Sequence, residues 1–493
     1  MGEQDSKINK LFLSGVGWMG ISKTISQVGT WVATILIARM LSPGDYGLVG
    51  MSGLLVGIIT LVGDFGLNSS IIRKESVTHR ELSALSWQFV LLGSFFFCLI
   101  YLLAPLGCSF WNEPDLLNLI RLSALSFFLT SLGQVPSALM QKKMRFKEYG
   151  FALSLSAIVG SGVTIILAYF GYGPYSLIFG TICVALTKLI VVFFYEPFRP
   201  QWVLFTVESK EHVKFAAASL GDRYLWWYYS NCDNWLASKF IGKSGYGHYS
   251  MAFHLASMPI SKIASIINPV VLPTLSQINS VAGRERFLLN VLKYLAYVSF
   301  PVFVGFFWIA DDLVGVLLGE KWEESVIVFK ALSLIFPLRV LGMLNVPLMY
   351  SMARPDVNLK NNAVASIMAT LAFAVGVHYG INGLAYAWII FYPLFFIIAL
   401  CYVSRVAGIS LTRYFKNLKI QFFGVLWMSL AIFIFNKYLM PFLESFIFGR
   451  NLVFVRLVGV ILSGSLFYCI FVAYFDRDLL SKAWDILRKR RIA

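Results

Sequence analysis

The stretch that decides the fold occurs twice: residues 35–47 read ILIARMLSPGDYG, and residues 235–247 read WLASKFIGKSGYG. Both copies contain an aliphatic residue followed by alanine, at Ile37-Ala38 and Leu236-Ala237, and both end on tyrosine and glycine. The copies lie about two hundred residues apart in an otherwise continuous series of apolar segments. This pattern predicts an internally duplicated membrane protein.

Composition places the chain among membrane proteins. Hydrophobic residues make up 58% of the chain and charged residues 13%, and the mean hydropathy is +0.73, far from the balance of a soluble domain. A spanning helix needs roughly 20 apolar residues, and spans of that length cover nearly all 493 positions. The expected fold is an all-α polytopic membrane protein with about 14 transmembrane helices.

The expected spans divide the chain into two lobes and an appendage. Six spans form an N-lobe within 1–210: residues 14–41, 46–67, 82–106, 116–139, 147–170 and 174–195. Six more form a C-lobe within 211–410: residues 213–241, 246–274, 288–310, 325–351, 358–378 and 382–404. Residues 411–475 hold two further spans without a counterpart, 417–439 and 453–475, and 476–493 form a basic amphipathic tail.

The duplication extends through both lobes. Its further matches pair Trp111, Arg121 and Val135-Pro136 with Trp322, Lys330 and Val346-Pro347. Because six helices per unit is an even number, both units enter the membrane from the same side, and they are related by an axis along the membrane normal. The expected architecture is two six-helix lobes that face each other across a central cavity.

Charge sets the expected orientation. The 41 basic residues give a net charge of +16, and most fall on one side of the predicted topology, such as the run 141–147 and the terminal 488–491. Since loops rich in Lys and Arg stay in the cytoplasm, both termini are expected in the cytoplasm. These positions explain the charge without nucleic acid, and Trp484 in the tail is expected to lie on anionic inner-leaflet lipids or on a protein partner.

Cations inside predicted spans are the candidate binding residues for an anionic substrate. They are Lys23, Arg223, Lys262 and Arg339. An ionised group at the centre of a span costs roughly 2.5 to 3.5 kcal/mol on insertion scales, so such groups usually face water, a partner or a ligand. The alternative is that they extend towards the headgroups or pair inside the protein. The six cysteines are scattered singly, which predicts neither a metal site nor a cofactor.

Two further groups complete the expected site. Asp64, Asp222 and Asp233 are candidate counter-ions, or sites where a coupling ion binds; Asp64 is equally placed to cap a helix. Trp226, Trp227 and Tyr228 are candidates for stacking on sugar rings. Because consecutive residues point all round a helix, at most two residues of this aromatic run can face one cavity.

The motifs resemble the multidrug/oligosaccharidyl-lipid/polysaccharide flippase superfamily and, within it, Wzx-type polysaccharide transporters related to colanic acid and teichuronic acid exporters. The likeness runs from about residue 12 to 410. Its clearest phrases are 38–47, 64–67, 71–75, 141–146, Asp233-Asn234, 247–252, Asn268-Pro269 and 273–276. One departure is Trp235, where relatives often have an aliphatic residue, and it leaves the shape of the cavity open.

The resemblance implies a flippase of the bacterial inner membrane that is not an enzyme. Its cargo would be an undecaprenyl-diphosphate-linked oligosaccharide repeat unit, moved by alternating access of the lobes, with polysaccharide polymerase machinery as an expected partner. Two rivals stay open from the residues. A cation-coupled multidrug exporter of the same superfamily would favour an acidic cavity, and a polysaccharide polymerase or ligase would need catalytic side chains on a sizeable outer loop.

Overall fold

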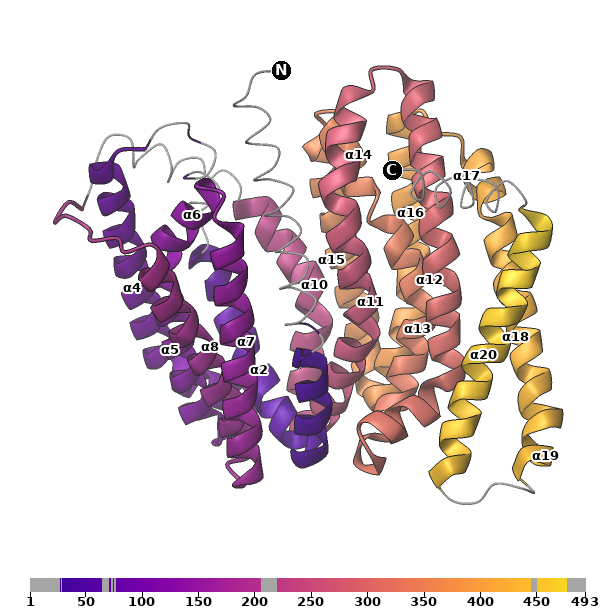
Figure 1. Ribbon diagram of the computed structural model, residues 1–493, viewed down its shortest axis with the longest axis horizontal. Coiled ribbons are helices and arrows are strands. Elements are labelled where there is room, and N and C mark those ends of the chain that lie inside the picture. Colours follow the sequence, from indigo (N-terminus) through magenta and orange to yellow (C-terminus); the bar gives the residue numbers. More distant parts are fainter. Residues whose placement is uncertain are drawn as a thin grey trace. The chain divides into compact units, whose positions relative to one another are not determined.

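The computed structural model (Figure 1) describes residues 27, 29–63, 71, 74, 77–204, 220–444 and 450–476. Throughout these ranges the regular structure is helical and includes no strand. Eight helices are long and apolar enough to cross a membrane, and two bent pairs raise that number to ten; a shorter apolar helix covers Gly29–Met40. The chain is therefore a multi-pass membrane protein, while fourteen spans remain a prediction.

The chain divides into two compact units, one up to Ser250 and the other from Met251. The boundary lies within a single long helix, and the lobe limits expected from the sequence, 1–210 and 211–410, remain predictions. Helices of the first unit, coloured indigo to magenta in Figure 1, are α2 (Pro43–Gly63), α4 (His79–Trp111), α5 (Leu116–Leu132), α6 (Gln134–Lys142), α7 (Phe146–Tyr169), α8 (Pro174–Tyr195) and α10 (Leu220–Phe240).

The boundary helix is α11 (Gly242–Gln277). The helices that follow it are α12 (Val281–Leu317), α13 (Ser325–Gly342), α14 (Asn345–Ser351), α15 (Pro355–Gly376), α16 (Gly380–Ala407), α17 (Leu411–Asn417), α18 (Lys419–Ile434), α19 (Met440–Glu444) and α20 (Arg450–Phe475). Short 3-10 turns at Glu320–Trp322 and Val377–Tyr379 precede α13 and α16, and a π-helical turn at Phe435–Leu439 follows α18.

The two halves repeat one order of elements. In the first, the predicted span 116–139 is broken at Gly133 into α5 and α6, with a bend of 43°. In the second, the predicted span 325–351 is likewise divided into α13 and α14. Two residues after each short helix ends, the chain has a residue in the left-handed conformation, Met144 (φ 55°) and Ala353 (φ 54°), followed by an arginine. Two non-glycine residues in a disfavoured conformation, 209 positions apart, mark the duplication in the backbone itself.

The repeated tyrosine–glycine phrases meet each other within the first unit. A Cβ atom on Gly47 would lie 1.8 Å from the carbonyl oxygen of Lys243, and one on Gly247 would lie 1.8 Å from that of Pro43. Gly50 faces the ring of Tyr246 in the same way, at 2.8 Å. The first turns of α2 and α11 thus touch backbone to backbone, which only glycine allows.

The Gly47→Ala variant is expected to lose about 1–3 kcal/mol of stability, because its new methyl group has no space unless the α2–α11 crossing opens. Thermal unfolding in detergent measures the effect. Gly53→Ala on the same helix is the control, since nothing lies within 4 Å of its Cβ position. Equal melting temperatures for the two variants would contradict the close crossing.

One face of α12 attaches the helices beyond residue 410. Four residues spaced four apart on this face, Glu285, Leu289, Lys293 and Tyr297, lie one above the other. Glu285 accepts hydrogen bonds from the backbone N–H of Ser410 (3.0 Å) and from Arg413 (2.8 Å), and Asn417 donates to the carbonyl of Leu289 (2.5 Å). Lys293 and Tyr297 both contact the buried carboxylate of Asp476, at the end of α20. The appendage is therefore joined to the second unit by specific polar contacts.

Candidate functional site

Some predicted site residues lie outside the described part of the chain. Lys23 and Asp64 belong to ranges that the structure does not describe. Asp222 and Arg223 lie in the first turn of α10, where only the backbone is described. The roles predicted for these four residues therefore remain predictions.

Asp233 is a buried carboxylate in the middle of α10, with only 1% of the residue exposed. The hydroxyl of Tyr249 donates to one carboxylate oxygen at 2.5 Å, and the side-chain amide of Asn234 donates to the other at 3.1 Å. Tyr246 in turn donates to the amide oxygen of Asn234 at 3.4 Å. The first turns of α11 therefore supply two tyrosines to a polar network around a membrane carboxylate, and a buried carboxylate needs such donors.

The aromatic residues of α10 divide between packing and exposure. Trp235, the departure from the resemblance, stacks on Trp111 of α4 at 5.5 Å, and the indole of Trp111 donates to Ser238 at 3.0 Å. Trp227 packs against α2, where its ring carbon would lie 3.4 Å from a Cβ on Gly57. Trp226 and Tyr228 are 54% and 41% exposed. The structure thus assigns Trp235 to packing and does not bring the three predicted stacking residues onto one surface.

Arg339 on α13 lies among three aromatic rings in the second unit. The centre of its guanidinium is 5.6 Å from the ring of Phe253 on α11, and 5.7 Å from the rings of Phe336 on α13 and Trp388 on α16. No carboxylate pairs with it anywhere in the described ranges. Each ring face attracts the cation by about 0.5–2 kcal/mol. The rings position the guanidinium without neutralising it.

Lys262 lies on α11, three residues after Pro259, and is partly buried. The helix α11 continues through Pro259, and its bend of 40° falls further on, between Ser265 and Pro269. Proline can remain within a spanning helix when neighbouring groups satisfy the freed carbonyl. The role of Lys262 as a binding residue remains a prediction.

A cation that the sequence analysis missed lies within α8. Lys188 borders a small cavity with Thr130 and Ser137, and its amine is 5.9 Å from the ring of Tyr149. Thr130 lies 209 positions before Arg339, the spacing of the internal repeat. Each unit thus places a cation at an equivalent pair of helices: Lys188 at α5 and α8, and Arg339 at α13 and α16. The available signal was a single lysine in the predicted span 174–195.

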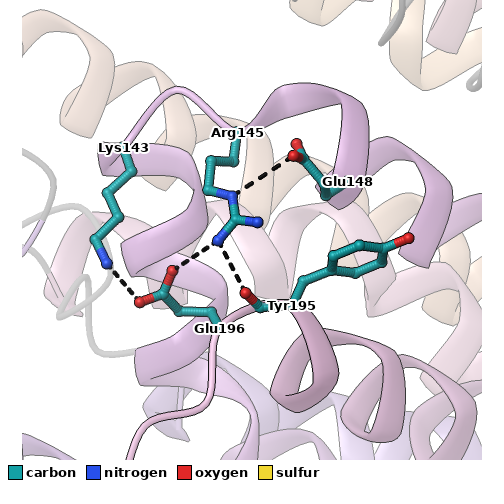
Figure 2. Close-up of polar contacts among 5 residues, drawn as sticks. All are labelled: Lys143, Arg145, Glu148, Tyr195 and Glu196. Atoms are coloured by element: carbon teal, nitrogen blue, oxygen red, sulfur yellow. Dashed lines mark hydrogen bonds and ion pairs between the residues drawn. The ribbon is translucent and has the colours of Figure 1, made fainter.

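Other basic residues of the first unit form ion pairs near the C-terminal end of α8 (Figure 2). Glu196, which follows α8, accepts from Lys143 at 2.5 Å and from Arg145 at 3.3 Å. Arg145 also donates to the carbonyl of Tyr195 at 2.8 Å and lies 3.6 Å from Glu148. This basic run therefore ties the loop before α7 to the end of α8, besides any part it has in setting orientation.

Replacing Tyr249 by Phe is expected to cost about 1–3 kcal/mol, because a buried carboxylate loses a hydrogen-bond donor. Chemical unfolding in detergent would show the loss. Tyr386→Phe is the control, since Tyr386 on α16 is 57% exposed and its hydroxyl should add little. If the two changes had the same effect, the network around Asp233 would contribute nothing to stability.

The repeated order of helices defines a class, the multi-pass membrane proteins built on an internal duplication. The chain aligns with a solved structure of the lipid II flippase MurJ in an inward closed conformation, with a TM-score of 0.73 over 94% of this chain and 99% of that one. The sequence identity is 15%, so this likeness shows the fold alone. The chain belongs to the polysaccharide biosynthesis protein family, whose model matches residues 36–327.

Two sequence relatives agree with the family. The teichuronic acid biosynthesis protein TuaB of Bacillus subtilis is 26% identical over 433 residues, covering 86% of this chain and 89% of its own. The lipopolysaccharide biosynthesis protein WzxC of Escherichia coli is 26% identical over 369 residues, covering 74% and 75%. The resemblance to Wzx-type polysaccharide transporters is confirmed.

Proposed function

We propose that this protein moves undecaprenyl-diphosphate-linked oligosaccharide units from the cytoplasmic to the outer leaflet of the bacterial inner membrane. The family and the transporter fold give the class, and Arg339 is the observation that carries the choice of cargo. A guanidinium among apolar helices, held by three rings and paired with no carboxylate in the described part, favours an anionic ligand.

The chemistry of the cage suits a diphosphate linked to sugars. Rings that cover the faces of Arg339 leave its N–H edges available, and those edges bind phosphate oxygens in bidentate fashion. The same ring surfaces offer apolar contact to a sugar. We propose that Lys23, Arg223 and Lys262 add to this site in a cationic central cavity, with at most two of Trp226, Trp227 and Tyr228 as further sugar contacts.

Acidic residues have a separate proposed role. Asp64, Asp222 and Asp233 would keep the empty cavity near neutrality or bind a coupling ion during alternating access of the two lobes. Asp233 has the strongest support, because its two donors stabilise a carboxylate in an apolar setting. An incoming cation would replace the hydrogen bond that Tyr249 donates to Asp233. Binding of the cation would then be coupled to a change in the local structure around Asp233.

The multidrug exporter remains the rival function. An exporter of cationic drugs would favour a carboxylate in its cavity, whereas the ring-lined cation at Arg339 would repel such a substrate. An enzymatic function has less support, because the family and the related structures are transporters. Contact with anionic inner-leaflet lipids and with polysaccharide polymerase machinery, and the cytoplasmic placement of both termini, belong to the same proposal.

Arg339→Ala is expected to lower the flipping rate of a lipid-diphosphate-linked oligosaccharide in proteoliposomes by about 10- to 100-fold, since a charge-assisted hydrogen bond contributes about 1.5–3 kcal/mol. Arg339→Lys should retain part of the rate, because it keeps the charge but not the planar fork. Arg354→Ala is the control, because Arg354 pairs with Asp356 at an exposed helix start. An unchanged rate in Arg339→Ala, at equal amounts of folded protein, would place the binding site elsewhere.

Lys23→Ala and Arg223→Ala test the proposed pair from the two lobes in the same assay. We expect each to slow flipping and the double variant to slow it further, while thermal unfolding stays near that of the native chain. Normal flipping by the double variant would remove both residues from the site. Absence of flipping by the native chain would instead favour drug export or an enzymatic function.

A further inference from the structure

We propose that Arg121, near the first turns of α5, binds the phosphate group of a membrane lipid. The site is separate from the proposed transport site and does not depend on it. Three observations carry the inference: the partner of the equivalent residue in the other unit, the absence of a carboxylate near Arg121, and the burial of one of its nitrogen atoms.

The internal repeat supplies the first observation. Arg121 and Lys330 are each the sixth residue of equivalent helices, α5 and α13. Lys330 is neutralised by Asp311, which lies on the preceding helix α12 with its carboxylate oxygen 2.7 Å from the amine. A third cation near a span end, Arg456 on α20, pairs with Asp312 at 3.3 Å. The second unit therefore provides a counter-ion for each of these two cations.

In the described part of the first unit, no carboxylate forms an ion pair with Arg121. No acidic residue occurs in the chain between Glu81 and Glu113, so most of α4 has nothing equivalent to Asp311. Glu113 and Asp115, the acidic residues just before α5, both accept hydrogen bonds from Lys243. In place of a carboxylate, α4 presents Tyr101, whose ring centre lies 4.3 Å from the guanidinium of Arg121.

The guanidinium also has unused hydrogen-bonding capacity. Its Nε atom is buried and makes no hydrogen bond within the described structure. A ring contact contributes about 0.5–2 kcal/mol and neither neutralises the charge nor accepts a hydrogen bond from the guanidinium edge. A phosphate would supply both the negative charge and the acceptor oxygens, because the planar guanidinium matches its geometry.

The position fits a lipid headgroup. Arg121 lies about 8 Å from the start of α5, at 1.5 Å per residue, which is near the boundary between headgroups and acyl chains. Tyr101 is 44% exposed, so the site opens away from the packed interior of the unit. The charge distribution of the sequence places this end of α5 on the outer side of the membrane, and the ligand would be an outer-leaflet lipid.

Native mass spectrometry of the full chain in detergent tests the proposal, with phosphatidylglycerol as the probe. We expect Arg121→Ala to weaken the binding of phosphatidylglycerol at that site about tenfold. At concentrations that saturate the native chain, the variant should therefore carry one fewer phosphatidylglycerol molecule. Lys330→Ala should leave the number of bound lipids unchanged, because Lys330 is already paired with Asp311. A melting temperature equal to the native one shows that a lost lipid does not reflect unfolding.

A gain-of-binding variant makes the test independent of any loss of stability. Asp311→Asn frees Lys330, and we expect it to add one bound phosphatidylglycerol molecule. An unchanged count in both Arg121→Ala and Asp311→Asn would overturn the proposal. Competition separates the two sources of phosphate: a lipid site keeps its phosphatidylglycerol in millimolar inorganic phosphate, and displacement by that anion would overturn the assignment to a lipid.

Discussion

The crossing of α2 and α11 is the constraint on which the rest of the first unit depends. Glycine at positions 47 and 247 lets the two backbones touch, and this contact brings the start of the second repeat against the first. Lys243, in the same turn, then reaches Glu113 at 2.9 Å and Asp115 at 3.4 Å. The stacking of Trp235 on Trp111 follows from the same approach. The two copies of the duplicated motif therefore contact each other. The glycine of each copy leaves room for the backbone of the other copy.

A second constraint is the cost of charge in an apolar setting, and the chain meets it in different ways. Several cations near helix ends are neutralised by a carboxylate, as in the cluster around Glu196 (Figure 2). Arg339 is instead surrounded by aromatic rings, and Asp233 by hydroxyl and amide donors. A cation that is fully paired with a carboxylate links two parts of the structure. A charged group whose charge is only partly compensated remains able to bind a ligand. This difference in surroundings separates the candidate site from the remaining charges.

The lengths of the apolar segments, and the residues that begin and end them, predicted much of the fold. Span 174–195 coincides with α8, because Pro174 begins the helix and the apolar run ends at Tyr195. The bend at Gly133 was not predicted, since apolar residues continue on both sides of it. Within the site, the depth of Arg339 could be read from its span, but two of its three rings, Phe253 and Trp388, come from α11 and α16, distant in sequence. Lys188 was missed for the same reason: its neighbours Thr130 and Ser137 belong to other helices, and no local pattern connects them.

The polar face of α12 has a consequence for how the protein is made. Tyr297 and its partner Asp476 are 179 residues apart in sequence, so α12 enters the membrane long before its partner helix exists. At the usual 5–20 residues per second, translation of that interval takes roughly 10–40 s. Throughout this time the chain on the ribosome carries Lys293 without its final counter-ion. The end of α20 therefore supplies the counter-ion to a helix inserted earlier, a step that a chain terminated before Asp476 cannot take.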